Sequence, residues 1–135
     1  MIKFRVEAQP VPKGRPRFTT RGKFPMAYTD AKTRDAEDNF AAQSVKYKPE
    51  LPIEGAIKLT LTFASIKPKS KPKKIKHWTT RPDLDNFIKL VKDALNKIFW
   101  VDDSQIVEVQ AKKIYDINSY TEVEIEPLEV SKENT

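Results

Sequence analysis

The chain has 135 residues, 39% of them hydrophobic and 33% charged, which suits one domain built around a single core. It contains no cysteine and one histidine, which excludes disulfide frameworks, thiolate metal sites and multi-histidine zinc sites. The formal net charge is +6, and no apolar run approaches the length of a membrane span or forms a signal-peptide core. We therefore expect a cytoplasmic protein without a membrane partner, with one domain over residues 1–128 and a flexible tail at 129–135.

The first expected elements are a strand and a helix. Apolar and polar residues alternate over residues 2–8, which predicts a half-buried strand. Regular structure is then excluded up to about residue 27 by Pro10, Pro12, Gly14, Pro16 and Pro25. Thr29 or Asp30 can cap a helix that runs to about Tyr47. The apolar face of this helix would consist of Ala36, Phe40, Ala41 and Ser44.

The remaining pattern predicts three strands and a second helix. Residues 57–63 alternate as a strand, and a second helix follows from about Leu84 to Phe99. Its apolar stripe, which must face the sheet, is formed by Leu84, Phe87, Ile88, Val91, Leu95 and Ile98. Strands are expected through residues 107–111 and 121–126. This order predicts an α+β domain, with a mixed β-sheet of about four strands and two main helices packed on it.

Basic residues are concentrated in two segments. Residues 1–27 contain seven basic residues against Glu7 alone, and residues 67–81 contain seven with no acid. Such clustering is typical of proteins that bind the phosphate backbone of nucleic acids, although two solvated loops would show it too. The candidate DNA-binding residues are Lys13, Arg15, Arg17, Arg21, Lys23, Lys67, Lys69, Lys71, Lys73, Lys74, Lys76 and Arg81.

Acidic residues gather at both ends of the second helix. Asp83 and Asp85 stand at its start, Lys89 follows one turn later, and Asp102 and Asp103 come just after its end. Carboxylates in an otherwise basic protein favour a bound cation, and Mg²⁺ or Mn²⁺ prefer such oxygen ligands. A divalent metal together with a nucleic-acid footprint predicts phosphodiester hydrolysis.

Each acidic residue also has a structural explanation. Asp83 can cap the helix, Asp85 can pair with Lys89 four residues later, and Asp102 with Asp103 can form a turn. Capping needs only one carboxylate, so these explanations account poorly for the whole group. Spacing does not bring the two ends of the helix together, and the strand after Asp103 must return along the helix for one site to close.

Three motifs carry a resemblance to a known family: R-P-D-L-D-N at residues 81–86 followed by Lys89, F-W-V-D-D-S-Q-I at 99–106, and P-K-G-R-P-R at 12–17 with the later Tyr28-Thr29. Together they resemble the RusA family of Holliday junction resolvases, and the amino-terminal motif resembles phage and prophage members. The resemblance covers roughly residues 1–127. It implies a homodimeric, Mg²⁺- or Mn²⁺-dependent endonuclease that nicks two opposed strands of a four-way DNA junction. By motif position it makes Asp83, Asp85 and Asp103 the metal-site acids and Lys89 the essential lysine, while Asp102 matches a less critical acid.

Two other functions remain open at this point. The chain could be a DNA-binding protein without catalytic activity, or a nuclease that acts on flaps or single strands. Paired cuts on strands related by two-fold symmetry favour a homodimer, and Phe18, Phe24 and Met26 are candidate interface residues. Trp78 could stack on an unpaired base or pack back on the sheet, which the sequence favours, and Trp100 is expected in the core.

Overall fold

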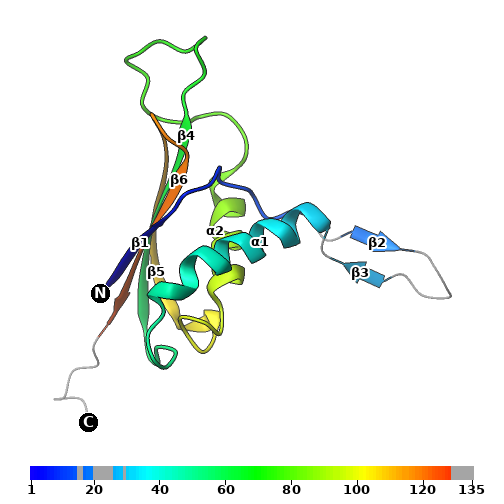
Figure 1. Ribbon diagram of the computed structural model, residues 1–135, viewed down its shortest axis with the longest axis vertical. Coiled ribbons are helices and arrows are strands. Elements are labelled where there is room, and N and C mark those ends of the chain that lie inside the picture. Colours follow the sequence, from blue (N-terminus) through cyan, green and yellow to red (C-terminus); the bar gives the residue numbers. More distant parts are fainter. Residues whose placement is uncertain (15–16, 20–25, 29, 129–135) are drawn as a thin grey trace.

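The sheet has four strands, β1 (Ile2–Val6), β4 (Ile57–Ile66), β5 (Ile106–Asp116) and β6 (Tyr120–Pro127), in the spatial order β1-β6-β4-β5. β4 and β5 are parallel, whereas the β1–β6 and β6–β4 pairs are antiparallel. Both main helices, α1 (Ala31–Ser44) and α2 (Leu84–Leu95), lie on one side of this sheet (Figure 1). This computed structural model describes residues 1–14, 17–19, 26–28 and 30–128, with side chains for 1–14 and 30–128. The predicted α+β fold is confirmed.

The core lies between the sheet and α2. Alternating residues of β4 and β6 point to this side, so the predicted two-residue periodicity becomes a continuous apolar layer. From α2, the buried side chains follow the expected stripe at three- and four-residue steps. The innermost side chains, all less than 2% exposed, include Leu59, Leu61, Phe63, Phe87, Val91, Leu95, Trp100, Val123 and Ile125.

The first helix begins and ends close to its predicted limits. Asp30 is its N-cap, and the Asp30 carboxylate accepts a hydrogen bond from the Thr33 backbone N–H at 2.8 Å. After Ser44 the chain tightens into a 3₁₀ turn, Val45–Tyr47, and leaves the helix. α1 packs against α2 and β1, so it closes the side of the core that the sheet leaves open.

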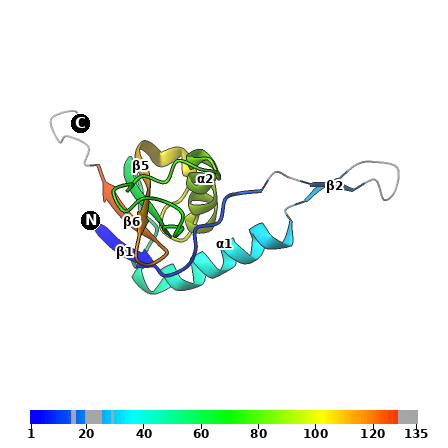
Figure 2. The same cartoon turned by 90° about the horizontal axis from the view of Figure 1, so that it is seen from above.

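Two predicted boundaries are wrong. The proline-rich segment contains a short hairpin, β2 (Arg17–Thr19) and β3 (Met26–Tyr28), which stands apart from the main sheet (Figure 2). Each of its strands has three residues and begins directly after a proline in the sequence, and proline is tolerated at the start of a strand. The second helix ends at Leu95 and not at Phe99, because Lys97 has a left-handed backbone (φ 68°). Residues 98–100 continue the apolar pattern from a turn, which is why periodicity overextended the helix.

Some predictions fall on parts that the structure does not describe. The side chains of Phe18, Phe24 and Met26 and the expected tail at residues 129–135 lie outside the described residues. Within the described part of the chain, no helix is long and apolar enough to cross a membrane.

Candidate functional site

The start of α2 presents two carboxylates to solvent. Asp83 occupies the N-cap position, with the extended backbone (φ −71°, ψ 145°) typical of that position, and Asp85 lies in the first turn. Both residues are exposed. The Asp83 side chain makes no capping hydrogen bond, and neither carboxylate has an ion-pair or hydrogen-bond partner among the described residues. The purely structural explanations of these two acids therefore find no support in their contacts.

An open hollow of about 600 Å³ borders this helix start. It is lined by Pro12, Lys13, Arg81, Pro82, Asp83 and Asn86. The backbone N–H of Lys13 donates to the Asn86 carbonyl oxygen at 2.9 Å, which fixes the N-terminal arm beside α2. Arg81 is exposed at the rim, so an anion in this hollow would lie between the Arg81 guanidinium and the Asp83 carboxylate. A guanidinium beside a carboxylate, a hard oxygen ligand, is a donor set that would fit a phosphate together with a divalent ion.

The segment that leads into the helix is held from the sheet by Lys113. The Nζ atom of Lys113 donates to the carbonyl oxygens of Thr80 at 2.8 Å and Pro82 at 2.6 Å. The same ammonium lies 5.3 Å from the ring centroid of Trp78, which is 7% exposed and packs on Phe87. The predicted packing of Trp78 on the sheet and of Trp100 in the core is confirmed. Trp78 therefore supports the segment that leads to Asp83 and is covered from solvent.

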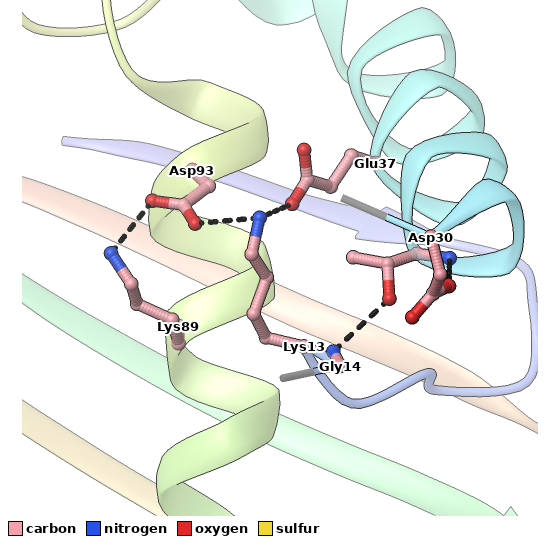
Figure 3. Close-up of polar contacts among 7 residues, drawn as sticks. Lys13, Gly14, Asp30, Glu37, Lys89 and Asp93 are labelled. Carbon is pink, nitrogen blue, oxygen red and sulfur yellow. Dashed lines mark hydrogen bonds and ion pairs between the residues drawn. The ribbon is translucent and has the colours of Figure 1, made fainter. Parts of the chain in front are cut away.

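Lys89 belongs to a chain of ion pairs that joins the two helices and the N-terminal arm (Figure 3). Lys89 Nζ lies 3.0 Å from Asp93 Oδ1, and the Asp85–Lys89 pair that the spacing allowed as an alternative is not formed. The other Asp93 oxygen lies 3.1 Å from Lys13 Nζ, which also pairs with Glu37 of α1. Burial alone would lower the pKa of Lys13, but the hydrogen bonds and charges of Glu37 and Asp93 outweigh it and raise that pKa.

Lys13 is thus committed to carboxylates of its own chain, although it was a candidate for DNA binding. Its neighbour Gly14 lies too close to α1 to carry a side chain: a Cβ there would be 2.5 Å from Asp30 Oδ2 and 2.7 Å from Thr33 Oγ1. The Gly14 N–H donates to Thr33 Oγ1 at 3.0 Å. The P-K-G part of the N-terminal motif therefore docks the arm onto the helices.

The second pair of acids lies at the other end of α2. Asp103 Oδ1 accepts a hydrogen bond from the buried Trp100 Nε1 at 2.8 Å. Asp102 caps the 3₁₀ turn Asp103–Gln105 in a capping box, and hydrogen bonds from Ser104 lower the Asp102 pKa. β5 starts immediately afterwards and reaches Lys113, beside Pro82, only seven residues later, a rise of roughly 23 Å.

The structure therefore places Asp83 and Asp85 at the start of α2, and Asp102 and Asp103 beyond its other end, within one chain. No group of three or more potential metal ligands occurs among the described residues. β5 does return along α2, as closure of one site would require, but Asp103 lies just before the start of β5, at the end away from Lys113. The metal-binding roles of these residues stay predictions.

The lysine-rich loop, residues 67–76, is folded, although it forms neither a helix nor a strand. Lys67 Nζ donates to the carbonyl oxygens of Pro72 at 2.9 Å and Lys73 at 2.8 Å, which closes the loop on itself. The other loop lysines, which have no ion-pair partner among the described residues, are Lys69, Lys71, Lys73, Lys74 and Lys76. The side chains of Arg15, Arg17, Arg21 and Lys23 lie outside the described residues.

Sequence reasoning missed Asp93, Glu37 and Lys113. Asp93 stands four residues after Lys89 on the same helix face, so the same rule that paired Lys89 with Asp85 could have found it. Lys113 lies opposite the buried Phe63 in the sheet register, and a lysine at a core-facing position is a detectable anomaly. Glu37 left no comparable signal, because its role depends on the path of the N-terminal arm.

The sequence of the chain also matches known proteins. Residues 7–126 match the family described as Endodeoxyribonuclease RusA. An uncharacterized protein of Bacillus subtilis (strain 168), YqaN, is 38% identical over 135 residues, 92% of this chain and 94% of the relative. A protein of Lactococcus phage r1t named crossover junction endodeoxyribonuclease rusA is 38% identical over 86 residues, 62% of this chain and 66% of the phage protein. The chain belongs to the RusA endodeoxyribonuclease family.

Proposed function

We propose that this protein is a magnesium-dependent endonuclease that makes paired, symmetric nicks in four-way DNA junctions during recombination and repair. The observation that carries the proposal is a pair of exposed carboxylates, Asp83 and Asp85, which lack partners among the described residues. Asp83 lines a hollow that has an exposed guanidinium at its rim. The family membership supports nuclease chemistry, and the name of the phage relative supports a junction as the substrate.

The two carboxylates fit a divalent ion. Mg²⁺ is usually held by one or two carboxylates, with waters and substrate phosphate completing its octahedral shell. Asp83 and Asp85 provide hard oxygen ligands that need not first break a bond to another described residue. Mn²⁺, with the same preference for oxygen ligands, should substitute.

Such an ion would polarise the scissile phosphate and lower the pKa of an attacking water. The protein residues would do the rest of the work. Arg81 would bind a non-bridging phosphate oxygen from the rim of the hollow. Lys89, which Asp93 holds one helical turn beyond Asp85, would neutralise charge that develops on the phosphate in the transition state. Lys113 would keep the Pro82–Asp83 segment in place while the DNA strand is cut.

The separation of the acids supports a homodimer in which Asp103 acts on the partner's site. β5 is an edge strand whose outer side no described strand covers from Ile106 to about Lys112, and Val107 and Val109 are 63% and 41% exposed there. Antiparallel pairing of two β5 edges about Val109 would set residue 103 of one protomer opposite residue 115 of the other. That position is two residues from Lys113, which contacts Pro82. A two-fold dimer would thus supply two complete sites, as two symmetric cuts require.

The test is a cleavage assay on synthetic DNA. A labelled four-way junction, a flap, a single strand and a linear duplex of the same sequence are incubated with the protein, with and without Mg²⁺. We expect Mg²⁺-dependent symmetric nicks in the junction alone. Binding without cleavage under all metal conditions would favour a DNA-binding protein without catalysis, and preferred cleavage of flaps or single strands would favour the other nuclease class.

A further inference from the structure

A second hollow, of about 660 Å³, lies beyond the β4 and β5 ends, near the lysine-rich loop. We propose that this hollow, the branch groove, receives an unstacked nucleobase and its flanking phosphates at the branch point of DNA. It is lined by Ile66, Lys67, Lys73, Ile75, Lys76, Tyr115, Asp116 and Ile117. This inference rests on the proposed function, because it names the part of the substrate that the protein holds next to the cleavage site.

The branch groove has apolar side chains that are exposed to solvent. Ile66, at the end of β4, is 59% exposed, and Ile117, in the turn between β5 and β6, is 84% exposed. Both line the same hollow with the partly buried ring of Tyr115. Single exposed apolar residues are ordinary, but a concave group of them between cations indicates a binding surface.

The groove wall is built by contacts within the chain. Lys67 Nζ fastens the loop through the carbonyl oxygens of Pro72 and Lys73, and the Tyr115 N–H donates to the Lys76 carbonyl oxygen at 2.8 Å. His77 forms a bridge with Ile114, so the loop continues the sheet edge next to β5. These bonds hold the lysine backbone against the strand end before any ligand binds.

Charge selects the kind of ligand. Lys73 and Lys76 are exposed and have no ion-pair partner among the described residues. The one acid among the residues that line the groove, Asp116, accepts hydrogen bonds from the Tyr120 hydroxyl at 2.6 Å and the Ile117 N–H at 2.7 Å. Apolar surface between exposed cations matches single-stranded DNA, in which bases contact side chains while phosphates meet lysines. Proteins that distort DNA likewise place aliphatic side chains against unstacked base steps.

The position of the groove connects it to the candidate active site. The segment that forms its wall continues through Trp78 and Thr80 directly to Asp83. The Trp78 backbone N–H donates to the Lys113 carbonyl oxygen at 3.3 Å, and Lys113 Nζ holds Thr80 and Pro82. Both hollows therefore lie at the same end of α2, where Figure 1 shows the loop above the helix start. A base held in the groove would fix where along the strand the scissile phosphate reaches Asp83 and Asp85.

The experiment measures base unstacking without cleavage. Four-way junctions carry the fluorescent base 2-aminopurine either at the branch point or in the middle of an arm, and are titrated with protein in EDTA. The unmodified protein should raise the fluorescence of the branch-point probe and leave the arm probe unchanged. Ile66→Ser with Ile117→Ser should remove that rise and weaken junction binding by about fivefold or more, the low end for one base contact. Duplex affinity should be unchanged.

A matched control and the contrary outcomes complete the test. Leu51→Ser alters a comparably exposed apolar residue, 79% exposed, in the turn before β4 at the opposite end of that strand, and should behave as the unmodified protein. If the double variant keeps both the fluorescence rise and the junction affinity, the groove does not hold a base. If it changes only the sedimentation of the protein, the groove is an interface between copies and the inference is overturned. A groove-dependent fluorescence rise in a protein that never nicks junctions would overturn the proposed function alone.

Discussion

Pairs of acidic residues lie near both ends of α2, but their surroundings differ. At the N-terminal end, Asp83 and Asp85 are exposed and have no partner among the described residues. At the C-terminal end, Asp103 accepts a hydrogen bond from buried Trp100, and Asp102 caps a turn. A carboxylate without a partner is available to a metal ion at no structural cost, whereas one oxygen of Asp103 already accepts a hydrogen bond that supports the core. Under the proposed function, the first pair would hold the metal ion, and Asp103 would both support the fold and complete the site.

The largest effect is expected at the N-terminal end of α2. Asp83→Asn or Asp85→Asn should lower the junction-nicking rate by more than about a hundredfold, since residues that merely orient metal ligands already cost up to that much. Junction binding in EDTA should be equal or tighter, because each change removes a negative charge near phosphate. Nicking rates and band-shift affinities measured on the same preparations check both statements. A variant that nicks at nearly the normal rate would remove that residue from the site.

Mixing two inactive variants tests whether the ends of α2 meet across a dimer. A dimer of one Asp83→Asn and one Asp103→Asn protomer should have one site with both changes and one with neither. Co-refolded mixtures should therefore recover nicks in one strand per junction, while each variant alone stays inactive. If both acids of a site came from one chain, every site in the mixture would be damaged and no activity would return.

Replacing an acid by leucine should affect stability differently at the two ends of α2. Asp103→Leu leaves the buried Trp100 Nε1 without an acceptor, which should lower the free energy of unfolding by about 1–3 kcal/mol. Asp83→Leu should change it by less than about 0.5 kcal/mol, as is usual for exposed residues without contacts. Urea denaturation followed by far-ultraviolet circular dichroism gives both values. Equal losses in the two variants would contradict the contrast between the ends.

The sequence predicted regular elements better than it predicted partners. Alternation located β1, β4 and β6 because each is apolar on one face only, and the acids of the D-L-D-N motif were found because their chemistry is local. The hairpin β2–β3 was missed because prolines dominate its surroundings, and α2 was drawn too long because Ile98 to Trp100 stay apolar after the helix has ended. Ion pairs such as Lys13 with Glu37 and Asp93 depend on where the N-terminal arm crosses two helices, which no local pattern encodes.

Lys13 and the lysines of the loop are expected to have different roles: Lys13 stabilises the fold, and the loop lysines bind DNA. Lys13→Met should cost about 1–2 kcal/mol of unfolding free energy, between the values for exposed and buried ion pairs. Because the folded-state pKa of Lys13 is raised, this stabilisation should be complete at neutral pH and fade only above about pH 10. In Lys13→Met, the dependence of DNA affinity on salt should not change.

The variant Lys73→Gln with Lys74→Gln should instead leave stability intact. It should flatten the slope of log affinity against log salt by about one for each phosphate that the variant no longer neutralises. The opposite result would make Lys13 a DNA contact and the loop a bystander.

The smallest effect is expected at Asp102, which separates capping from catalysis within the second acidic pair. Asp102→Asn keeps a side-chain oxygen for the Ser104 N–H but loses the charge, so its urea midpoint at pH 7 should lie between those of the unmodified protein and Asp102→Ala. Asp102→Ala removes the cap and should shift the urea midpoint slightly downward, with nicking rates unchanged for both variants. Hydrogen bonds to the carboxylate lower the Asp102 pKa, so its contribution is present above about pH 4 and is lost as the pH falls through the folded-state value. The midpoints of the unmodified protein and Asp102→Ala should therefore converge in acid. A nicking defect in Asp102→Asn, in protein that is still fully folded at pH 7, would instead assign this carboxylate to the metal site beside Asp103.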